Sequence, residues 1–132
     1  MKYRRLGRSG LQVSEMSVGT MNFGGPTDEI ESFRIIDMAM DRGINLFDCA
    51  DVYADGASEK IVGKALKQDG KRKRVIVTTK AFWPTGDGPN DRGNSRHHLI
   101  QACEDSLDRL NTDYIDIFFF TGPIGMFPRK KR

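Results

Sequence analysis

The sequence has 132 residues, of which 38% are hydrophobic and 30% charged, which is ordinary for one globular domain with a real core. It contains no run of about 18 apolar residues and no apolar stretch behind its first five residues, so neither a membrane span nor a secretory signal is expected. Its two cysteines have no metal-type spacing, which favours free thiols in a reducing cytoplasm and predicts no metal site.

The net charge of +3 comes from the last four residues, 129–132, which are all basic. Without them, 17 basic residues face 18 acidic ones, so the body of the chain is close to neutral. A basic charge confined to a tail does not indicate a nucleic-acid-binding surface. Neither a nucleic acid nor a membrane is therefore expected as a partner.

Two strand-like pieces open the chain, and they are predicted to form a small β-hairpin over residues 3–13. Arg8-Ser9-Gly10 supplies the turn signal between them. The first core strand is predicted over residues 16–21, with Gly19 near its end, where a backbone or a ligand can approach closely. The chain is thus expected to begin with an antiparallel hairpin, which the first strand of the core then follows.

A helix is predicted after the chain break at Gly24-Gly25-Pro26. Asp28 with Glu31 three residues later is a capping-box variant that starts this helix, and Gly43 ends it. Its apolar stripe is expected to consist of Ile30, Phe33, Ile36 and Met40. The second core strand, residues 45–48, follows at once.

A second helix is predicted from residue 58 to residue 68, and Asp69-Gly70 ends it. Its apolar face is expected to hold Ile61, Val62, Ala65 and Leu66. A basic run at residues 71–74 then leads into the third strand, residues 75–79. We expect this run to be a solvated loop rather than a nucleic-acid patch, because short charge runs usually face water.

A long loop rich in glycine, proline and aspartate is predicted over residues 82–94, and loops of this length are often functional. Asn94 or Ser95 can cap a third helix after it. The apolar stripe of that helix is expected to consist of Ile100, Cys103, Leu107 and Leu110. The fourth strand is predicted over residues 114–120, and residues 121–132 show no periodicity.

The predicted order of four strands alternating with three helices places the chain in the α/β class with a parallel sheet. No Gly-x-Gly-x-x-Gly follows the first strand, which disfavours a Rossmann nucleotide site, and no Gly-x-Ser-x-Gly indicates a hydrolase. The repeating units favour a (β/α)₈ TIM barrel. Since a full barrel needs about 250 residues, the chain is expected to form a partial barrel of about four βα units behind an N-terminal hairpin.

Asp48, Tyr53 and Lys80 are the candidate chemical residues. Asp48 ends the second strand, Tyr53 follows in the next loop, and Lys80 ends the third strand. In a parallel α/β sheet the C-terminal ends of the strands and the loops after them form the reactive edge. An acid, a phenol and an ammonium at this edge predict a proton-transfer site.

The chain resembles the N-terminal half of the aldo-keto reductase family. The matching stretches are Tyr3 to Leu11, Val18 to Gly24, Phe47-Asp48 through Tyr53, Ser58-Glu59 with Val62-Gly63, Thr79-Lys80, and Leu107 to Asp116. They fall in order over about residues 3–120, and as a set they are highly specific. The family folds as a (β/α)₈ barrel and reduces carbonyls with NADPH, or less often NADH, without a metal. The resemblance therefore implies an NADPH-dependent reductase of small aldehydes or ketones.

The family uses a catalytic tetrad of Asp, Tyr, Lys and His, and the resemblance carries three members onto Asp48, Tyr53 and Lys80. A free tyrosine has a pKa near 10, and a nearby ammonium favours the phenolate. The resemblance thus implies Tyr53 as the general acid of reduction, with the Lys80 ammonium held in place by Asp48.

The fourth member, a histidine, is missing from its expected position, which Thr121 occupies after the strand at residues 114–120. His97 and His98 lie early on the predicted third helix and cannot replace it. Loss of a group that polarises a carbonyl typically lowers the rate by about a hundredfold to a thousandfold. Impaired activity is therefore expected.

The resemblance places Gly19, Thr20 and Met21 on the floor of the cofactor site, together with Asp48, although a glycine there equally serves tight packing. The family's later strands carry much of the nicotinamide stacking surface and the adenosine phosphate clamp. No counterpart follows Thr121, so weak NADPH binding is expected.

Three further residues near these motifs have less specific interpretations. Asp51 is expected to be a loop or hydrogen-bonding residue rather than a proton carrier, and Cys49 a buried small hydrophobe. Trp83 follows the third strand, where it either walls a substrate pocket or is an aromatic of the core or loop.

The predicted domain organisation is an N-terminal barrel half over residues 1–120 and a divergent, disordered basic tail over residues 121–132. The abrupt loss of the family pattern suggests a premature or frame-shifted terminus, or a deliberately cut chain. Residues 128–132 imitate a nuclear-import or phosphate-binding patch, which makes a small basic binding module the weakest alternative.

A second alternative is a non-catalytic fragment that acts by associating with itself or with a full-length relative. The predicted sheet has two edges, and one of them is the apolar strand that ends in Phe118-Phe119-Phe120. An open apolar edge invites pairing with another chain. Self-association or poor solubility of the isolated chain is therefore expected.

Overall fold

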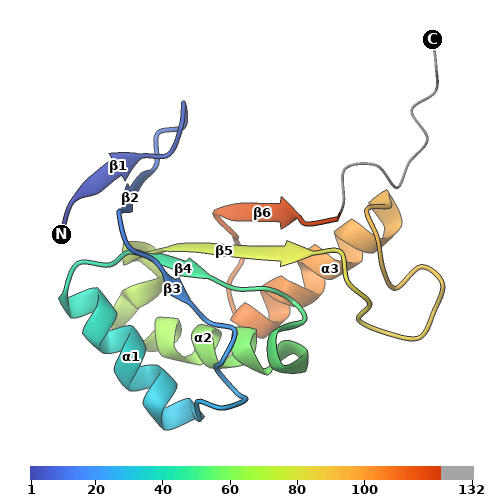
Figure 1. Cartoon of the computed structure of the whole chain (residues 1–132), viewed down its shortest axis with the longest axis horizontal. Coiled ribbons are helices and arrows are strands. Elements are labelled where there is room, and N and C mark those ends of the chain that lie inside the picture. Colours follow the sequence, from blue (N-terminus) through green and yellow to red (C-terminus); the bar gives the residue numbers. More distant parts are fainter. Residues whose placement is uncertain (123–132) are drawn as a thin grey trace.

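The computed structural model describes residues 1–122, and Figure 1 shows how their strands and helices are arranged. The predicted disorder of the basic tail and the binding patch at residues 128–132 lie outside the described residues, apart from Thr121 and Gly122. The division of the chain at residue 120 into two parts therefore stays a prediction.

The predicted N-terminal hairpin is confirmed. Strand β1 (Tyr3–Arg5) pairs antiparallel with β2 (Gln12–Ser14), with Arg4 opposite Val13. The side chain of Asn45 fixes the hairpin to the chain that precedes the second core strand, since its Oδ1 accepts from the Ser14 N–H at 2.8 Å. The hairpin consequently lies at the end of the main sheet where the strands begin (Figure 1).

The main sheet is parallel, as predicted, and its strands lie in sequence order. The strands are β3 (Val18–Gly19), β4 (Leu46–Asp48), β5 (Ile76–Ala81) and β6 (Ile117–Phe120). Gly19 pairs with Asp48, and Asp48 in turn pairs with Thr78. Sequential parallel strands joined by helices are the arrangement of a (β/α) barrel wall. The fold class of a partial barrel is thus confirmed.

Three helices lie along one face of this sheet in Figure 1: α1 (Glu29–Asp41), α2 (Ala57–Lys67) and α3 (Arg96–Leu110). The two predicted N-caps are confirmed. The Asp28 carboxylate accepts from the Glu31 N–H at 2.8 Å, and the Ser95 hydroxyl accepts from the His98 N–H at 3.1 Å. These caps satisfy backbone donors that the first turn of a helix leaves free.

The core lies between the sheet and the helices. Its fully buried apolar side chains include Ile36, Phe47, Val62, Leu66 and Val77. The predicted face of α2 is confirmed, because all four of its expected apolar residues are buried.

The predicted stripes of α1 and α3 are partly wrong. Ile30 is exposed on α1, and Ile100 is exposed on α3. Along α3 the buried side chains are His98, Ala102, Ser106 and Leu110. Ala102 and Ser106 are small, and small side chains let the backbones of α3 and α2 approach closely, whereas the predicted stripe did not include these two residues.

The basic run before β5 is also partly different from its prediction as a solvated loop. Lys73 and Arg74 are exposed, but Arg72 is largely buried, with its side chain 13% exposed. Its guanidinium donates to the Asp116 carboxylate at 2.9 Å and lies 3.8 Å from the centroid of the Tyr114 ring. A planar guanidinium can combine ion pairing with stacking, so Arg72 ties the start of β5 to the approach to β6.

The outer strand β6 exposes two aromatic side chains, Phe119 and Phe120, which are 45% and 62% exposed. Among residues 1–122 no further strand pairs with its outer edge. An apolar edge of this kind supports the expected self-association, which stays a prediction. No helix within this range is both long and apolar enough to cross a membrane.

Candidate active site

Asp48 and Lys80 meet at the C-terminal ends of two neighbouring strands. The Lys80 Nζ donates to Asp48 Oδ1 at 2.7 Å and to the Cys49 carbonyl oxygen at 2.6 Å. Thr78 Oγ1 donates to the same Asp48 oxygen at 2.7 Å. Residues two apart on a strand point to the same face, so the pairing of Asp48 with Thr78 brings Lys80 onto the carboxylate. The ammonium is therefore both paired and fixed in direction.

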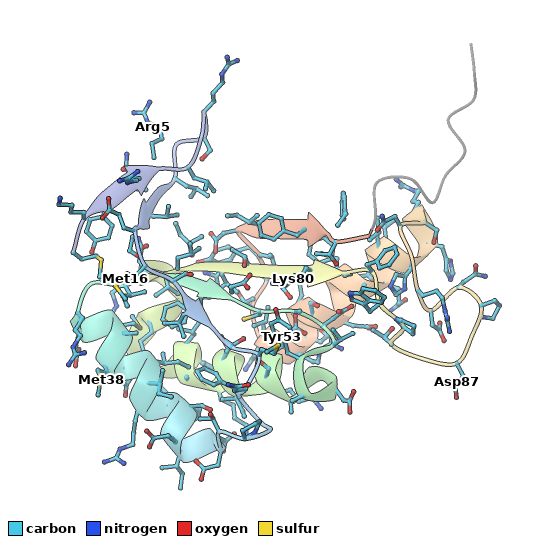
Figure 2. The ribbon with its side chains drawn as sticks, in the orientation of Figure 1. Arg5, Met16, Met38, Tyr53, Lys80 and Asp87 are labelled. Atoms are coloured by element: carbon cyan, nitrogen blue, oxygen red, sulfur yellow. The ribbon has the colours of Figure 1, made fainter. Side chains whose placement is uncertain are left out.

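Tyr53 reaches the same place because the chain continues beside β5 after β4 ends. The Cys49 N–H donates to the Thr78 carbonyl at 2.8 Å, and the Asp51 N–H donates to the Lys80 carbonyl at 3.2 Å. Lys80 Nζ then lies 5.2 Å from the centroid of the Tyr53 ring, and Figure 2 shows the two residues close together. The structure thus brings all three predicted residues together.

The segment that carries Tyr53 has an unusual backbone. Tyr53 opens a short 3₁₀ segment, η1 (Tyr53–Gly56), in which Ala54 and Asp55 have φ values of 48° and 52° and Gly56 has 89°. Left-handed conformations are disfavoured for residues with a Cβ. Non-glycine residues in such conformations cluster at functional sites, where surrounding structure holds them.

A buried charged cluster behind the site was missed by the sequence analysis. Glu59 is fully buried, and its two carboxylate oxygens accept from Arg109 Nε and Thr79 Oγ1, each at 2.6 Å. A signal was present, since Glu59 lies three residues before Val62 and seven before Leu66 on the buried face of α2. A carboxylate on an apolar face requires a partner, because acidic residues are almost never fully buried unpaired.

Asp51 belongs to this cluster and is also buried. Burial, then the nearby Glu59 charge, raises the pKa of Asp51 from its ordinary 3.8 to about 6, while Arg109 opposes the rise. Its Oδ2 has no hydrogen-bond partner within residues 1–122. Asp51 is thus a hydrogen-bonding residue through its backbone N–H, and its side chain is a carboxylate whose charged form is disfavoured by burial.

Replacing Asp51 with asparagine is expected to stabilise the fold at neutral pH. A carboxyl whose pKa is raised by folding loses stabilising free energy as the pH rises from about 4 through about 6. Since one pKa unit is worth about 1.4 kcal/mol, we expect Asp51→Asn to gain about 1 kcal/mol at pH 7.5 and nothing below pH 4. Urea unfolding of both chains at the two pH values measures this, and an equal gain at both would contradict it.

The predicted cofactor-floor residues differ in how accessible they are. Gly19 and Met21 are exposed, whereas Thr20 is fully buried. The Thr20 hydroxyl donates to the Asp48 carbonyl at 3.1 Å and accepts from Ser58 Oγ at 2.9 Å. Its side chain therefore supports the backbone of Asp48, and the role of the three residues toward a cofactor stays a prediction.

Other residues singled out from the sequence have clear positions. Cys49 is fully buried, as predicted, and burial raises the pKa of its thiol to about 12. Trp83 is exposed and packs edge-on against Phe82, with ring centroids 5.2 Å apart. Cys49 is thus an unreactive part of the core, whereas the side chain of Trp83 is available at the surface after β5.

Thr121 occupies the position after β6 where the family resemblance led us to expect a histidine. Its N–H donates to the Ala81 carbonyl at 3.4 Å, so it lies beside the end of β5 at the same edge as Lys80. His98 lies in the first turn of α3 and is buried, and His97 precedes it on the same helix. Neither histidine occupies the position after β6.

Within the described part of the chain, no group of three or more His, Cys, Asp or Glu side chains could hold a metal ion. A hollow of about 390 Å³ lies between the hairpin and α1, at the opposite end of the sheet from Lys80. Its lining includes Tyr3, Asp37 and Lys71. None of Asp48, Tyr53 and Lys80 lines this hollow, so the carboxylate, ammonium and phenol lie apart from it, at the C-terminal edge of the sheet.

The parallel sheet and the residues at its C-terminal edge define one wall of a (β/α)₈ barrel that carries an acid, an amine and a phenol. The chain belongs to the Aldo/keto reductase family, whose sequence model matches residues 15–129. This confirms the family and the barrel-type fold that the sequence motifs indicated.

Two individual relatives are similar to this chain over most of its length. The chain is 43% identical to a probable voltage-gated potassium channel subunit beta of Oryza sativa subsp. japonica. The alignment extends over 130 residues and covers 97% of this chain and 39% of the relative. It is 46% identical over 127 residues to the uncharacterized oxidoreductase YrpG of Bacillus subtilis (strain 168), covering 89% of this chain and 39% of that protein.

Among solved structures, the chain resembles aldo-keto reductase AKR11C1 from Bacillus halodurans in its holo form. The TM-score is 0.78 and the identity 41%, over 91% of this chain and 40% of that one. The chain thus spans about two fifths of the length of the relatives that it matches.

Proposed function

We propose that this chain carries the proton-transfer residues of an NADPH-dependent reductase of aldehydes and ketones. The observation that supports this most directly is the Lys80 ammonium, held 2.7 Å from Asp48 Oδ1 and 5.2 Å from the centre of the Tyr53 ring. Family membership supports an oxidoreductase, and the choice of NADPH over NADH rests on the family resemblance alone.

The residues at this edge are compatible with a nicotinamide cofactor. A Cβ placed on Gly19 would meet no atom within 4 Å, so open space lies next to the strand partner of Asp48. Met21, two residues on, is exposed. We propose that Gly19 and Met21 line the floor of the cofactor site, while buried Thr20 holds the Asp48 backbone beneath it. A reduced nicotinamide bound there would supply the hydride.

In the proposed mechanism, Tyr53 donates its hydroxyl proton to the carbonyl oxygen of the substrate. The adjacent Lys80 ammonium stabilises the phenolate that remains, because opposite charges at short range favour the ionised form. Asp48 and Thr78 hold Lys80 at that position through the contacts to Asp48 Oδ1. In oxidation of an alcohol the same phenolate would accept the proton.

The test of this proposal is turnover of a generic aromatic aldehyde by the 132-residue chain with NADPH, followed by the loss of reduced-nicotinamide absorbance. Slow but enzyme-dependent turnover is expected, because Thr121 replaces a group whose loss costs about a hundredfold to a thousandfold. A rate equal to that of buffer with either NADPH or NADH would overturn the proposal. The free thiols of Cys49 and Cys103 are compatible with the reducing cytoplasm in which such chemistry is proposed to occur.

A further inference from the structure

We propose that the buried ion pair between Glu59 and Arg109 is a positioning device that holds Tyr53 against Lys80. The inference rests on the proposed function of Tyr53 as proton donor. It concerns two residues that touch neither Asp48 nor Lys80 through a hydrogen bond or ion pair within residues 1–122. They lie on α2 and α3, behind the reactive edge.

The segment after Tyr53 has a backbone conformation that gains from an external restraint. Ala54, Asp55 and Gly56 are all left-handed, and an L-residue leaves this conformation when nothing holds it. Gly56 is also the N-cap of α2, yet no side chain caps the helix there. The turn has a backbone hydrogen bond of its own, from the Asp55 N–H to the Val52 carbonyl at 3.2 Å. Contacts from elsewhere in the fold add to it, and one of them is the bond from Ser58 Oγ to the Thr20 carbonyl at 2.7 Å.

Arg109 of α3 provides such a contact. Its side chain covers Gly56 so closely that a Cβ on that residue would lie 2.8 Å from Arg109 Cδ. The same side chain donates through Nε to Glu59 Oε2 at 2.6 Å and through a terminal nitrogen to Ser106 Oγ at 3.3 Å. The guanidinium is thus fixed at both ends while its methylene groups press on the turn.

Glu59 connects this contact to the strand that carries Lys80. Its second carboxylate oxygen accepts from Thr79 Oγ1 at 2.6 Å, and Thr79 directly precedes Lys80. Successive side chains of a strand point to opposite faces of the sheet, so Thr79 points toward the helices and Lys80 points to the face where it meets Asp48. One buried carboxylate therefore joins the Lys80 strand to the arginine that holds the Tyr53 turn.

A general stabilising role is a poorer explanation of this pair. Burying two charges costs desolvation free energy that their attraction often only balances, so a buried ion pair is weak support for stability. The pair Arg72 and Asp116 provides a comparison, because it is similarly buried and joins the approaches to β5 and β6. It touches neither the Tyr53 turn nor the C-terminal end of β5.

The experiment reports whether the Tyr53 ring lies next to Lys80, and it does not depend on catalytic activity. In chains with ¹³C-labelled lysine, the ring current of Tyr53 displaces the NMR signal of the Lys80 ε-methylene. Lys80→Met assigns that signal, and Tyr53→Leu defines its position without a ring. We expect Arg109→Met to move the signal most of the way to the Tyr53→Leu position, and the matched control Arg72→Met to leave it in place.

Arg109→Lys keeps the charge but lacks the Nε donor and the planar fork, so an intermediate signal is expected. This variant also decides the question if Arg109→Met does not fold. An unchanged Lys80 signal in either folded Arg109 variant, or an equal displacement in Arg72→Met, would overturn the inference.

An activity arm separates this inference from the proposed function. Misplacement of a catalytic group by about 1 Å can cost a hundredfold, so Arg109→Lys is expected to lower kcat with little change in the KM for NADPH. If the parent chain reduces no aldehyde, the proposed function fails, while the NMR comparison still decides whether Arg109 positions Tyr53.

Discussion

Replacing Tyr53 with phenylalanine is expected to lower the kcat of carbonyl reduction by about a hundredfold to ten-thousandfold, the range that a general acid contributes. The substitution removes the hydroxyl alone. The ring that lies 5.2 Å from Lys80 Nζ is kept, so the ammonium and the surrounding backbone should keep their places. A loss confined to kcat would show that the hydroxyl acts in the transition state rather than in binding.

The measurement compares aldehyde-dependent oxidation of NADPH by the parent chain and by the Tyr53→Phe variant. Tyr3→Phe is the matched control, because the Tyr3 hydroxyl donates to the Gly43 carbonyl at 2.7 Å at the other end of the sheet. Its kcat should equal that of the parent. Equal turnover by parent and Tyr53→Phe would remove Tyr53 from the mechanism and leave the proton donor to be sought elsewhere.

The elements of this fold were predictable because the local signals and the tertiary contacts agree. Short apolar runs ended at Asp48 and Lys80, and the structure places both residues at the same edge of the parallel sheet. The N-caps at Asp28 and Ser95 were visible because the capping chemistry is local. Where a single turn or strand end determines the local structure, the sequence pattern was sufficient to predict it.

The errors occurred where the partner lies far along the chain. Arg72 was expected in solvent, yet it pairs with Asp116, which is 44 residues away. Glu59 and Arg109 were given no role, and they meet across 50 residues. A charge pattern within a short window says how a residue would behave next to water, and it contains no information on a distant residue of opposite charge. Such pairs require the packing of α2 against α3 to be known first.

That packing depends on one glycine, and replacing this glycine is expected to destabilise the fold. A Cβ on Gly63 of α2 would lie 2.5 Å from the carbonyl oxygen of Leu110 and 2.8 Å from that of Arg109. Both atoms belong to the backbone of α3, so no side chain can rotate away. Alanine favours a helix over glycine by about 1 kcal/mol, but overpacking typically costs about 1–3 kcal/mol or more. We expect Gly63→Ala to lose about 2 kcal/mol on balance.

Urea unfolding followed by circular dichroism measures this change as a lower midpoint with an unchanged slope. Gly10→Ala serves as the control, since a Cβ on that residue would meet no atom within 4 Å, and its free energy of unfolding should change by less than about 0.5 kcal/mol. A stabilised Gly63→Ala chain would mean that helix propensity outweighs the contact with Leu110.

In the expected case the displaced helix α3 also carries Arg109 away from Glu59, so the methyl group added at residue 63 should also displace the Lys80 NMR signal that reports the position of Tyr53. A loss of stability without that displacement would separate the packing of α3 from the positioning of Tyr53.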